Sequence, residues 1–185
     1  DGFQGGSKVT STSTRLAPLL VIISFISLTI WGPNGHIGEV KVGRGEDVLH
    51  ALLGSCVGIA LLCPSKKVYG LAHCLLPESP KITVNIGARY VDQAIKSLLL
   101  LMGIKKAQYS EVQAVLAGGG NMTKPQSANE EDLIGSINVN KAIECLKTAG
   151  IPIICQDVGG ITGRKISLHC GSEKYEIKRI SRQGS

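Results

Sequence analysis

The sequence lacks the patterns that mark several common functional classes. Its six cysteines form no Cys-x-x-Cys pair and no dense knuckle spacing, so a zinc-finger module is not predicted. The glycine run 118–120 is followed by no Lys-Ser or Lys-Thr pair, and no G-x-G-x-x-G motif occurs, which argues against a phosphate-binding loop. No G-x-S-x-G motif surrounds Ser55, so a serine nucleophile is discounted, and no internal repeat is found.

Aromatic residues and acidic charge are both scarce. Only 4% of the 185 residues are Phe, Trp or Tyr, and 20 Lys and Arg residues outnumber 14 Asp and Glu residues. Much of the formal charge of +6 lies near the end of the chain, in Arg164, Lys165, Lys174, Lys178, Arg179 and Arg182. Only Tyr175 accompanies them, whereas nucleic-acid-binding modules often combine basic residues with stacking aromatic residues. We therefore predict a solvated strand face and no nucleic-acid partner.

Most cysteines lie inside apolar runs, where a free thiol behaves as a small hydrophobic group. This placement predicts a reduced, cytoplasmic protein with no metal and no cofactor. A zinc ion held by Cys56, Cys63, Cys74 and His73 is the alternative interpretation of the same residues.

The first 33 residues differ in composition from the rest. Residues 1–14 are rich in Gly, Ser and Thr and are predicted to be disordered. The apolar run 19–28 is shorter than the ~20 residues that span a bilayer, and no small-residue cleavage site follows it. A signal-peptide core, a short anchor and a buried strand or helix all remain open for it. We predict an N-terminal extension at 1–33 and a folded domain at 34–185.

Apolar periodicity predicts the elements of that domain. Helical spacing over 91–102 and 138–149 predicts two helices that end at Gly103 and Gly150, with Asn138 capping the second. Strands are predicted at 37–42, 58–63, 68–73, 112–117, 152–155, 165–170 and 175–180, and loops at 77–87 and 121–131. Because strands outnumber helices, the pattern indicates an α/β or α+β domain with a mixed sheet.

A predicted hairpin brings a thiol to an imidazole. The turn at 64–67 separates two short apolar segments. In the resulting register His73 lies opposite Gly58, and Cys56 lies opposite Leu75. Cys56 and His73 then share one face as diagonal neighbours, roughly 7–8 Å apart at the backbone. A slip of one residue would place them on opposite faces.

Cys56 and His73 are the two residue types that a thiol-dependent amide hydrolase uses as nucleophile and as acid–base group. Cys56 can act as the nucleophile, and His73 can accept the thiol proton and return one to the leaving group. The turn at Gly54 and Ser55 can present backbone N–H groups to an oxyanion, since glycine permits a close approach. The alternative is that Cys56 is a buried core thiol.

An ordered set of motifs resembles the CheD family, the chemoreceptor glutamine deamidases of bacterial chemotaxis. The motifs are Leu53–Val57, Ala72–His73, Leu76–Ser79, Ala88–Asp92, Gly118–Met122, Ile134–Gly135, Asn138–Val139, Asp157–Gly160 and Gly163–Lys165. The resemblance covers about residues 37–180. It implies a layered fold with helices packed on a β-sheet, and a strand at 46–53, where local propensity alone is helical.

The resemblance also implies a reaction and partners. The reaction is hydrolysis of glutamine side-chain amides on methyl-accepting chemoreceptors through a thioester at Cys56. The implied partners are those receptors and a CheC-type phosphatase, with contact to the membrane only through the receptors.

The sequence departs from the family pattern at two positions. The family usually carries threonine a few residues before the cysteine, in the stretch 49–53, where this chain has no hydroxyl residue. His50 is therefore a candidate third catalytic residue, and a surface histidine is the alternative. Ile137 stands where the family tends to have arginine. Two further functions stay open: a catalytically weak module that binds the phosphatase or receptor helices, and a different cysteine amidohydrolase or acyl transferase.

Overall fold

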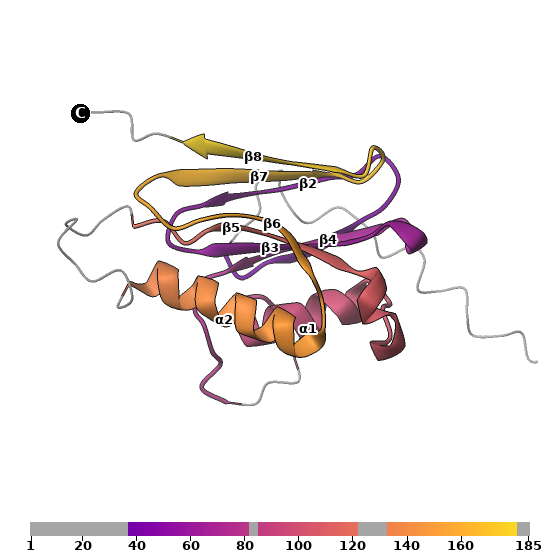
Figure 1. Ribbon diagram of the computed structural model, residues 1–185, viewed down its shortest axis with the longest axis horizontal. Coiled ribbons are helices and arrows are strands. Elements are labelled where there is room, and N and C mark those ends of the chain that lie inside the picture. The colour runs from indigo at the N-terminus through magenta and orange to yellow at the C-terminus, as the bar shows by residue number, and fades with distance from the viewer. Residues whose placement is uncertain (1–36, 82–84, 122–132, 181–185) are drawn as a thin grey trace, which may run out of the picture. The chain divides into compact units, whose positions relative to one another are not determined.

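The chain folds into stacked layers, with a three-stranded sheet, a five-stranded sheet and a pair of helices (Figure 1). The computed structural model describes residues 37–81, 85–121 and 133–180, all within one structural unit. The apolar run 19–28, the proposed boundary at 33/34 and most of the expected loop 121–131 lie outside the described residues. The expectation of a layered α+β domain with a mixed sheet packed by helices is confirmed.

The five-stranded sheet is the middle layer. Its order is β1-β4-β3-β5-β6, with β1 at Val40–Gly43, β4 at Val68–Cys74, β3 at Val57–Cys63, β5 at Gln113–Gly118 and β6 at Ile153–Val158. All neighbouring pairs are antiparallel except β5 and β6, which are parallel and are joined through a helix. A parallel pair requires such a crossover, so the helix between these strands accounts for the mixed character of the sheet.

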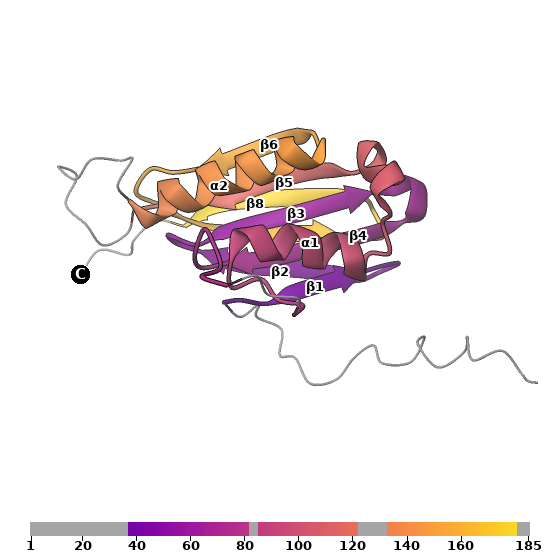
Figure 2. The same ribbon diagram turned by 90° about the horizontal axis from the view of Figure 1, so that it is seen from below.

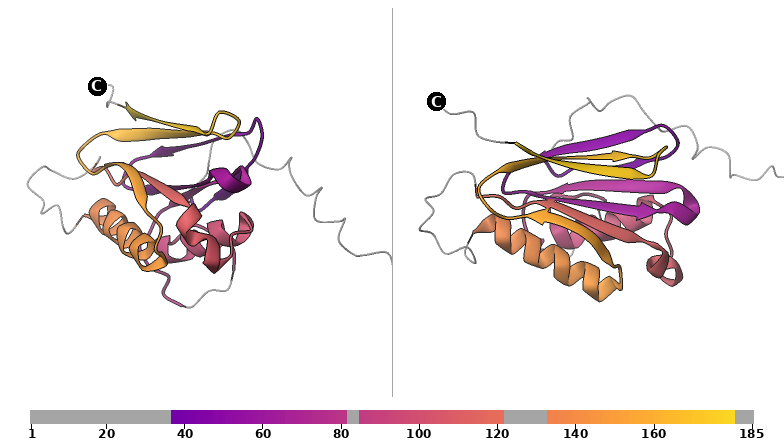
Figure 3. Two further views of the ribbon diagram at one scale, coloured as in Figure 1. Left: turned by 45° about the vertical axis from the view of Figure 1, so that its right-hand side comes forward. Right: turned by 45° about the horizontal axis from the view of Figure 1, so that its top comes forward.

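The second sheet was not predicted as a separate layer. It is antiparallel, in the order β2-β7-β8, with β2 at Val48–Leu53, β7 at Gly163–His169 and β8 at Lys174–Ile180 (Figure 3). The expected hairpin of the last two strands is confirmed. Residues 48–53 form a strand, as the family resemblance implied, because Leu49, Ala51 and Leu53 alternate inward with period two.

Two helices cover the outer face of the five-stranded sheet (Figure 2). Helix α1, Val91–Leu101, packs on β4 and β1, and α2, Ile134–Ala149, packs on β3, β5 and β6. Gly103 and Gly150 follow these helices with φ of +69° and +71°, which confirms both predicted ends. The predicted start of α2 was wrong, since Asn138 lies inside the helix rather than at its cap.

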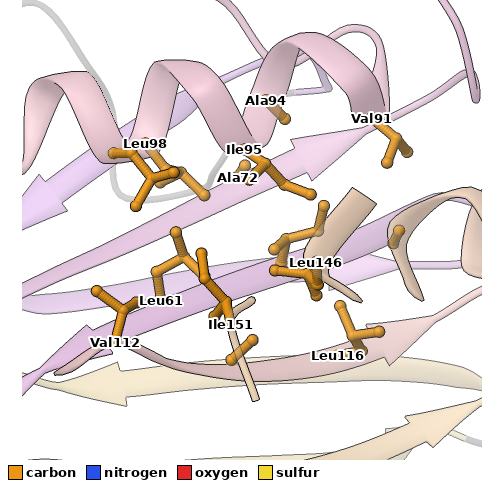
Figure 4. Packing of buried hydrophobic residues seen from close by; sticks show 14 of the residues in the cluster. Leu61, Ala72, Val91, Ala94, Ile95, Leu98, Val112, Leu116, Leu146 and Ile151 are labelled. Atoms are coloured by element: carbon orange, nitrogen blue, oxygen red, sulfur yellow. The ribbon is translucent and has the colours of Figure 1, made fainter. Parts of the chain in front are cut away.

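Strands β3 and β4 are buried on both faces, so alternate residues enter different cores. Odd-numbered residues of β3 and even-numbered residues of β4 face the helices, where Leu61 and Ala72 pack beneath Ile95 and Leu98 (Figure 4). Each fully buried aliphatic side chain there contributes about 1.5–3 kcal/mol. The opposite faces meet the three-stranded sheet in a second core. One register therefore determines which layer every side chain of this hairpin reaches.

No helix within the described residues has the length and apolar character needed to cross a bilayer.

Candidate active site

Cys56 lies where the chain passes from one sheet to the other. Strand β2 ends at Leu53, β3 begins at Val57, and the intervening residues form a bend. The Cys56 side chain is 6% exposed and belongs to the core between the two sheets. The bend thus places a thiol between the layers at the end of a buried strand.

His73 reaches the same layer from the neighbouring strand. It lies opposite Gly58 in the β3–β4 ladder, as the hairpin prediction required, and its side chain is 5% exposed. The residues just before β1 fix its backbone, because the His73 N–H donates to Glu39 O over 3.0 Å and the Gly38 N–H donates to His73 O over 2.8 Å. Cys56 lies just before the ladder, which begins at Val57, and it belongs to the core between the sheets, on the side of β3 and β4 that His73 also faces.

The structure separates His50 from this pair. In β2, Leu49, Ala51 and Leu53 face the core between the sheets, whereas the intervening positions point outward. His50 is one of these outward positions, opposite Ser167 in β7. Strand alternation therefore places its side chain on the face of β2 away from Cys56, which argues against the direct contact expected of a third catalytic residue.

A glycine turn after β5 holds the Cys56 bend in place. The Gly119 N–H donates to Cys56 O and the Gly120 N–H donates to Gly54 O, each over 2.8 Å. Gly118 has φ of +100°, and a Cβ atom at this position would overlap Cys56 O. Only glycine allows both the backbone conformation and the close approach, so the run 118–120 serves to brace the cysteine bend.

Asn138 contacts the same region from α2. Its residue is fully buried, and its side-chain Nδ2 donates to Leu75 O over 3.0 Å and to Ser55 O over 3.4 Å. Sequence reasoning missed this contact, because asparagine before an apolar helical run is also typical of a helix cap. The available signal was an asparagine aligned with the apolar face of the helix.

An ion-pair network of Arg164, Asp157 and Arg179, of which only Arg164 is buried, supports the turn that contacts the glycine run. Arg164 is 3% exposed and donates to Asp157 Oδ1 over 3.1 Å and to the carbonyls of Gly159 and Thr162. Arg179 also donates to Asp157. The Gly159 N–H in turn donates to Gly118 O over 2.9 Å. The expectation that these basic residues form a solvated face is wrong for Arg164.

Burial dominates the electrostatics of the thiols. It raises the pKa of the Cys56 thiol above its ordinary value, and the Cys56 backbone amide opposes that shift. Burial likewise raises the pKa of Cys74, and it raises the pKa of Cys170 to about 11. An imidazolium beside a thiol lowers the pKa of that thiol, so burial of Cys56 acts in the opposite direction to the effect expected of a Cys–His pair. Burial therefore favours the neutral form of the Cys56 thiol.

The zinc alternative does not fit the fold. Cys63 and Cys74 face the helices, whereas Cys56 and His73 face the other sheet, so the four side chains do not converge. Within residues 37–81, 85–121 and 133–180, no cluster of three or more His, Cys, Asp or Glu residues could hold a metal ion. All six cysteines lie in these ranges as free thiols.

Comparison with known proteins shows the family. A family model described as "CheD chemotactic sensory transduction" matches residues 75–179, more than half of the chain. The chain belongs to the CheD family. The match begins two residues after His73 and includes Asn138, Asp157 and Arg164.

Several CheD relatives resemble the chain over most of their length. A probable chemoreceptor glutamine deamidase CheD 2 of Ruegeria sp. (strain TM1040) is 40% identical over 165 residues, covering 80% of this chain and 92% of the relative. A probable chemoreceptor glutamine deamidase CheD of Bdellovibrio bacteriovorus is 35% identical, covering 78% of this chain and 92% of the relative. One of Pyrococcus abyssi is 37% identical, covering 78% and 89%. The family resemblance inferred from the motifs is confirmed.

Proposed function

We propose that this chain hydrolyses glutamine side-chain amides on methyl-accepting chemoreceptors and leaves glutamate. The observation that carries the proposal is the placement of Cys56 and His73 in the same layer, between the two sheets. That pair occurs in a chain whose CheD relatives are named chemoreceptor glutamine deamidases. A thiol beside an imidazole is the arrangement that nucleophilic amide hydrolysis requires.

The reaction consists of two displacements at one carbon atom. His73 accepts the proton of Cys56 as the sulfur attacks the amide carbon, and it then gives a proton to the departing nitrogen, which leaves as ammonia. The resulting thioester is attacked by water, which loses a proton to His73. Collapse of that intermediate breaks the C–S bond and releases the glutamate carboxylate and the thiol. Water is the only co-reactant, so the proposal includes no cofactor.

The bend before β3 supplies the groups proposed to stabilise the oxyanion. Gly54 O and Ser55 O accept hydrogen bonds from the Gly120 N–H and from Asn138 Nδ2. Across a trans peptide bond the N–H points away from the preceding C=O, so the N–H groups of Ser55 and Cys56 point away from these donors. Fixed N–H groups beside the attacking sulfur stabilise the tetrahedral intermediate without reorganisation.

The proposal gives the His50 side chain no part in the chemistry, because it lies on the outer face of β2. The proposed partners of the protein are the receptor substrate and a CheC-type phosphatase. The phosphatase is proposed from the family resemblance alone. A cytoplasmic location completes the proposal, and the six free thiols are consistent with a reducing compartment.

Peptide mass spectrometry of chemoreceptor fragments incubated with the protein tests this function. Conversion of Gln to Glu at particular positions is the expected result. A tight complex without conversion would instead identify a binding module. Incorporation of an added primary amine in place of water would identify an acyl transferase.

A further inference from the structure

The side chain of Asn138 joins the two chain segments that carry the thiol and the imidazole. Ser55, whose carbonyl it binds, precedes Cys56 directly, and Leu75, the other acceptor, follows His73 by two residues. Both acceptors bind the same nitrogen, Nδ2, at 3.4 and 3.0 Å. One side chain of a third element thus contacts both segments.

This contact lies at the end of the β3–β4 ladder. The ladder ends at the pair of Val57 and Cys74, so neither Ser55 nor Leu75 belongs to it. The Leu75 N–H has already turned to another segment, where it donates to Arg89 O over 3.1 Å. Beyond the last strand pair, the amide of Asn138 takes the place of a ladder hydrogen bond between these segments.

The environment of Asn138 indicates that packing alone does not account for this side chain. The neighbouring buried positions of α2 are Val139, Ala142 and Leu146, and asparagine forms helices less readily than leucine. Its Oδ1 atom is buried and has no hydrogen-bond partner among the residues that the structure describes. An unsatisfied buried acceptor destabilises a fold, whereas an apolar side chain of similar size would not.

We propose that Asn138 is a positioning residue, which sets the separation of Cys56 from His73 by holding Ser55 and Leu75 together. The inference rests on the proposed deamidase function and adds a component to it. Misplacement of a nucleophile by about 1 Å costs roughly 10²-fold in rate. Two hydrogen bonds to the backbone next to Cys56 and close to His73 therefore affect catalysis strongly.

The experiment compares Asn138→Leu and Asn138→Ala with a matched control, Ser97→Ala. Ser97 is also a buried polar residue of a helix, and its Oγ accepts a hydrogen bond from the Gly87 N–H over 3.1 Å. This control removes a buried side-chain hydrogen bond on α1, at a distance along the chain from the Cys56 bend. Urea unfolding by circular dichroism gives the folded fraction of each variant, to which all rates are normalised.

Two readouts distinguish positioning from simple destabilisation. In the full-length protein, kcat for receptor deamidation should fall at least tenfold in both Asn138 variants, with KM changed less than about threefold. The pH profile of Cys56 labelling by iodoacetamide should shift as well, because it reports the surroundings of the thiol without any substrate. The Ser97→Ala variant should keep the wild-type kcat and labelling profile.

Each outcome decides one of the two proposals. Wild-type kcat and an unshifted Cys56 labelling profile in a folded Asn138→Leu variant would overturn the inference. Failure of both Asn138 variants to fold, while Ser97→Ala folds, would overturn it too, since the role would then be structural. A wild-type protein that deamidates no receptor fragment would refute the proposed function instead, whatever the labelling profiles show.

Discussion

His73 lies directly opposite Gly58 in the ladder between β3 and β4, and this pairing decides which layer the imidazole enters. Both positions face the three-stranded sheet, the side on which Cys56 is buried. Gly58 has no side chain, and a Cβ there would lie 2.7 Å from Leu53 Cδ1. A slip of one residue would turn His73 toward the helices, away from the layer in which Cys56 is buried.

The first prediction concerns the protonation of Cys56. Because burial raises the pKa of this thiol, its iodoacetamide labelling should continue to rise beyond about pH 8.5, the ordinary pKa of cysteine. Labelling over about pH 6–10, with peptide mass spectrometry to resolve each cysteine, gives the profile. A midpoint below about pH 7 would show a preformed thiolate–imidazolium pair and contradict the general-base mechanism.

The two histidines should differ in their contribution to catalysis. His73→Ala should lower the deamidation rate by about 10²-fold or more, the usual effect of losing a general acid–base group. His50→Ala should stay within about threefold of wild type, because its side chain lies on the outer face of β2. Initial rates on one receptor fragment compare both variants. A similar loss in the two would restore His50 to the catalytic set.

Local patterns predicted the parts of this structure that depend on neighbouring residues. The 3.6-residue period over 91–102 predicted α1, and the four-residue turn at 64–67 fixed the register that places His73 opposite Gly58. Such signals are local, because side-chain period and loop length together determine one helix face or one hairpin.

Contacts between distant segments could not be predicted in this way. Asn138 has the same local signal whether it caps a helix or binds backbone carbonyls from inside one. Arg164 appeared solvated because its partner, Asp157, belongs to another strand. The separate sheet of β2, β7 and β8 and the burial of Cys56 between the sheets likewise depend on tertiary packing.

The close approach of Gly118 to Cys56 can be tested by stability measurements, with Gly160 in the turn after β6 as the control position. Gly160 has φ of +66° and open space around it, so Gly160→Ala should cost only the strain of a left-handed residue, about 1–2 kcal/mol. Gly118→Ala adds an overlap with Cys56 O and should destabilise the fold further while lowering deamidation. Urea unfolding and rate assays on both variants test this difference. Equal stability and equal activity in the two would refute the bracing role of Gly118.

The ion-pair network predicts a pH dependence of stability. Hydrogen bonds from Arg179, and then from Arg164, lower the pKa of Asp157 below its ordinary value, so its contribution is present above pH ~4 and is lost as the pH falls through the lowered pKa. Asp157→Asn should destabilise the fold near pH 7 by ~1–3 kcal/mol, because buried Arg164 loses its charged partner but keeps its two carbonyl acceptors.

The control for this network is Arg179→Ala, which removes an exposed partner and should change stability little. Urea unfolding at about pH 7 and pH 3 gives the comparison. The difference between wild type and Asp157→Asn should shrink at the lower pH. A difference that is the same at both values would show that the carboxylate charge does not contribute.

The most direct test of the account measures Gln-to-Glu conversion by Cys56→Ala on a receptor fragment that the wild type deamidates. Cys63→Ala is the matched control, because Cys63 is also a buried thiol, at the other end of β3, but it faces the helices. Mass spectrometry should show conversion reduced by at least ~10³-fold in Cys56→Ala and retained in Cys63→Ala, with both variants folded. Continued conversion by folded Cys56→Ala would contradict the assignment of Cys56 as the nucleophile.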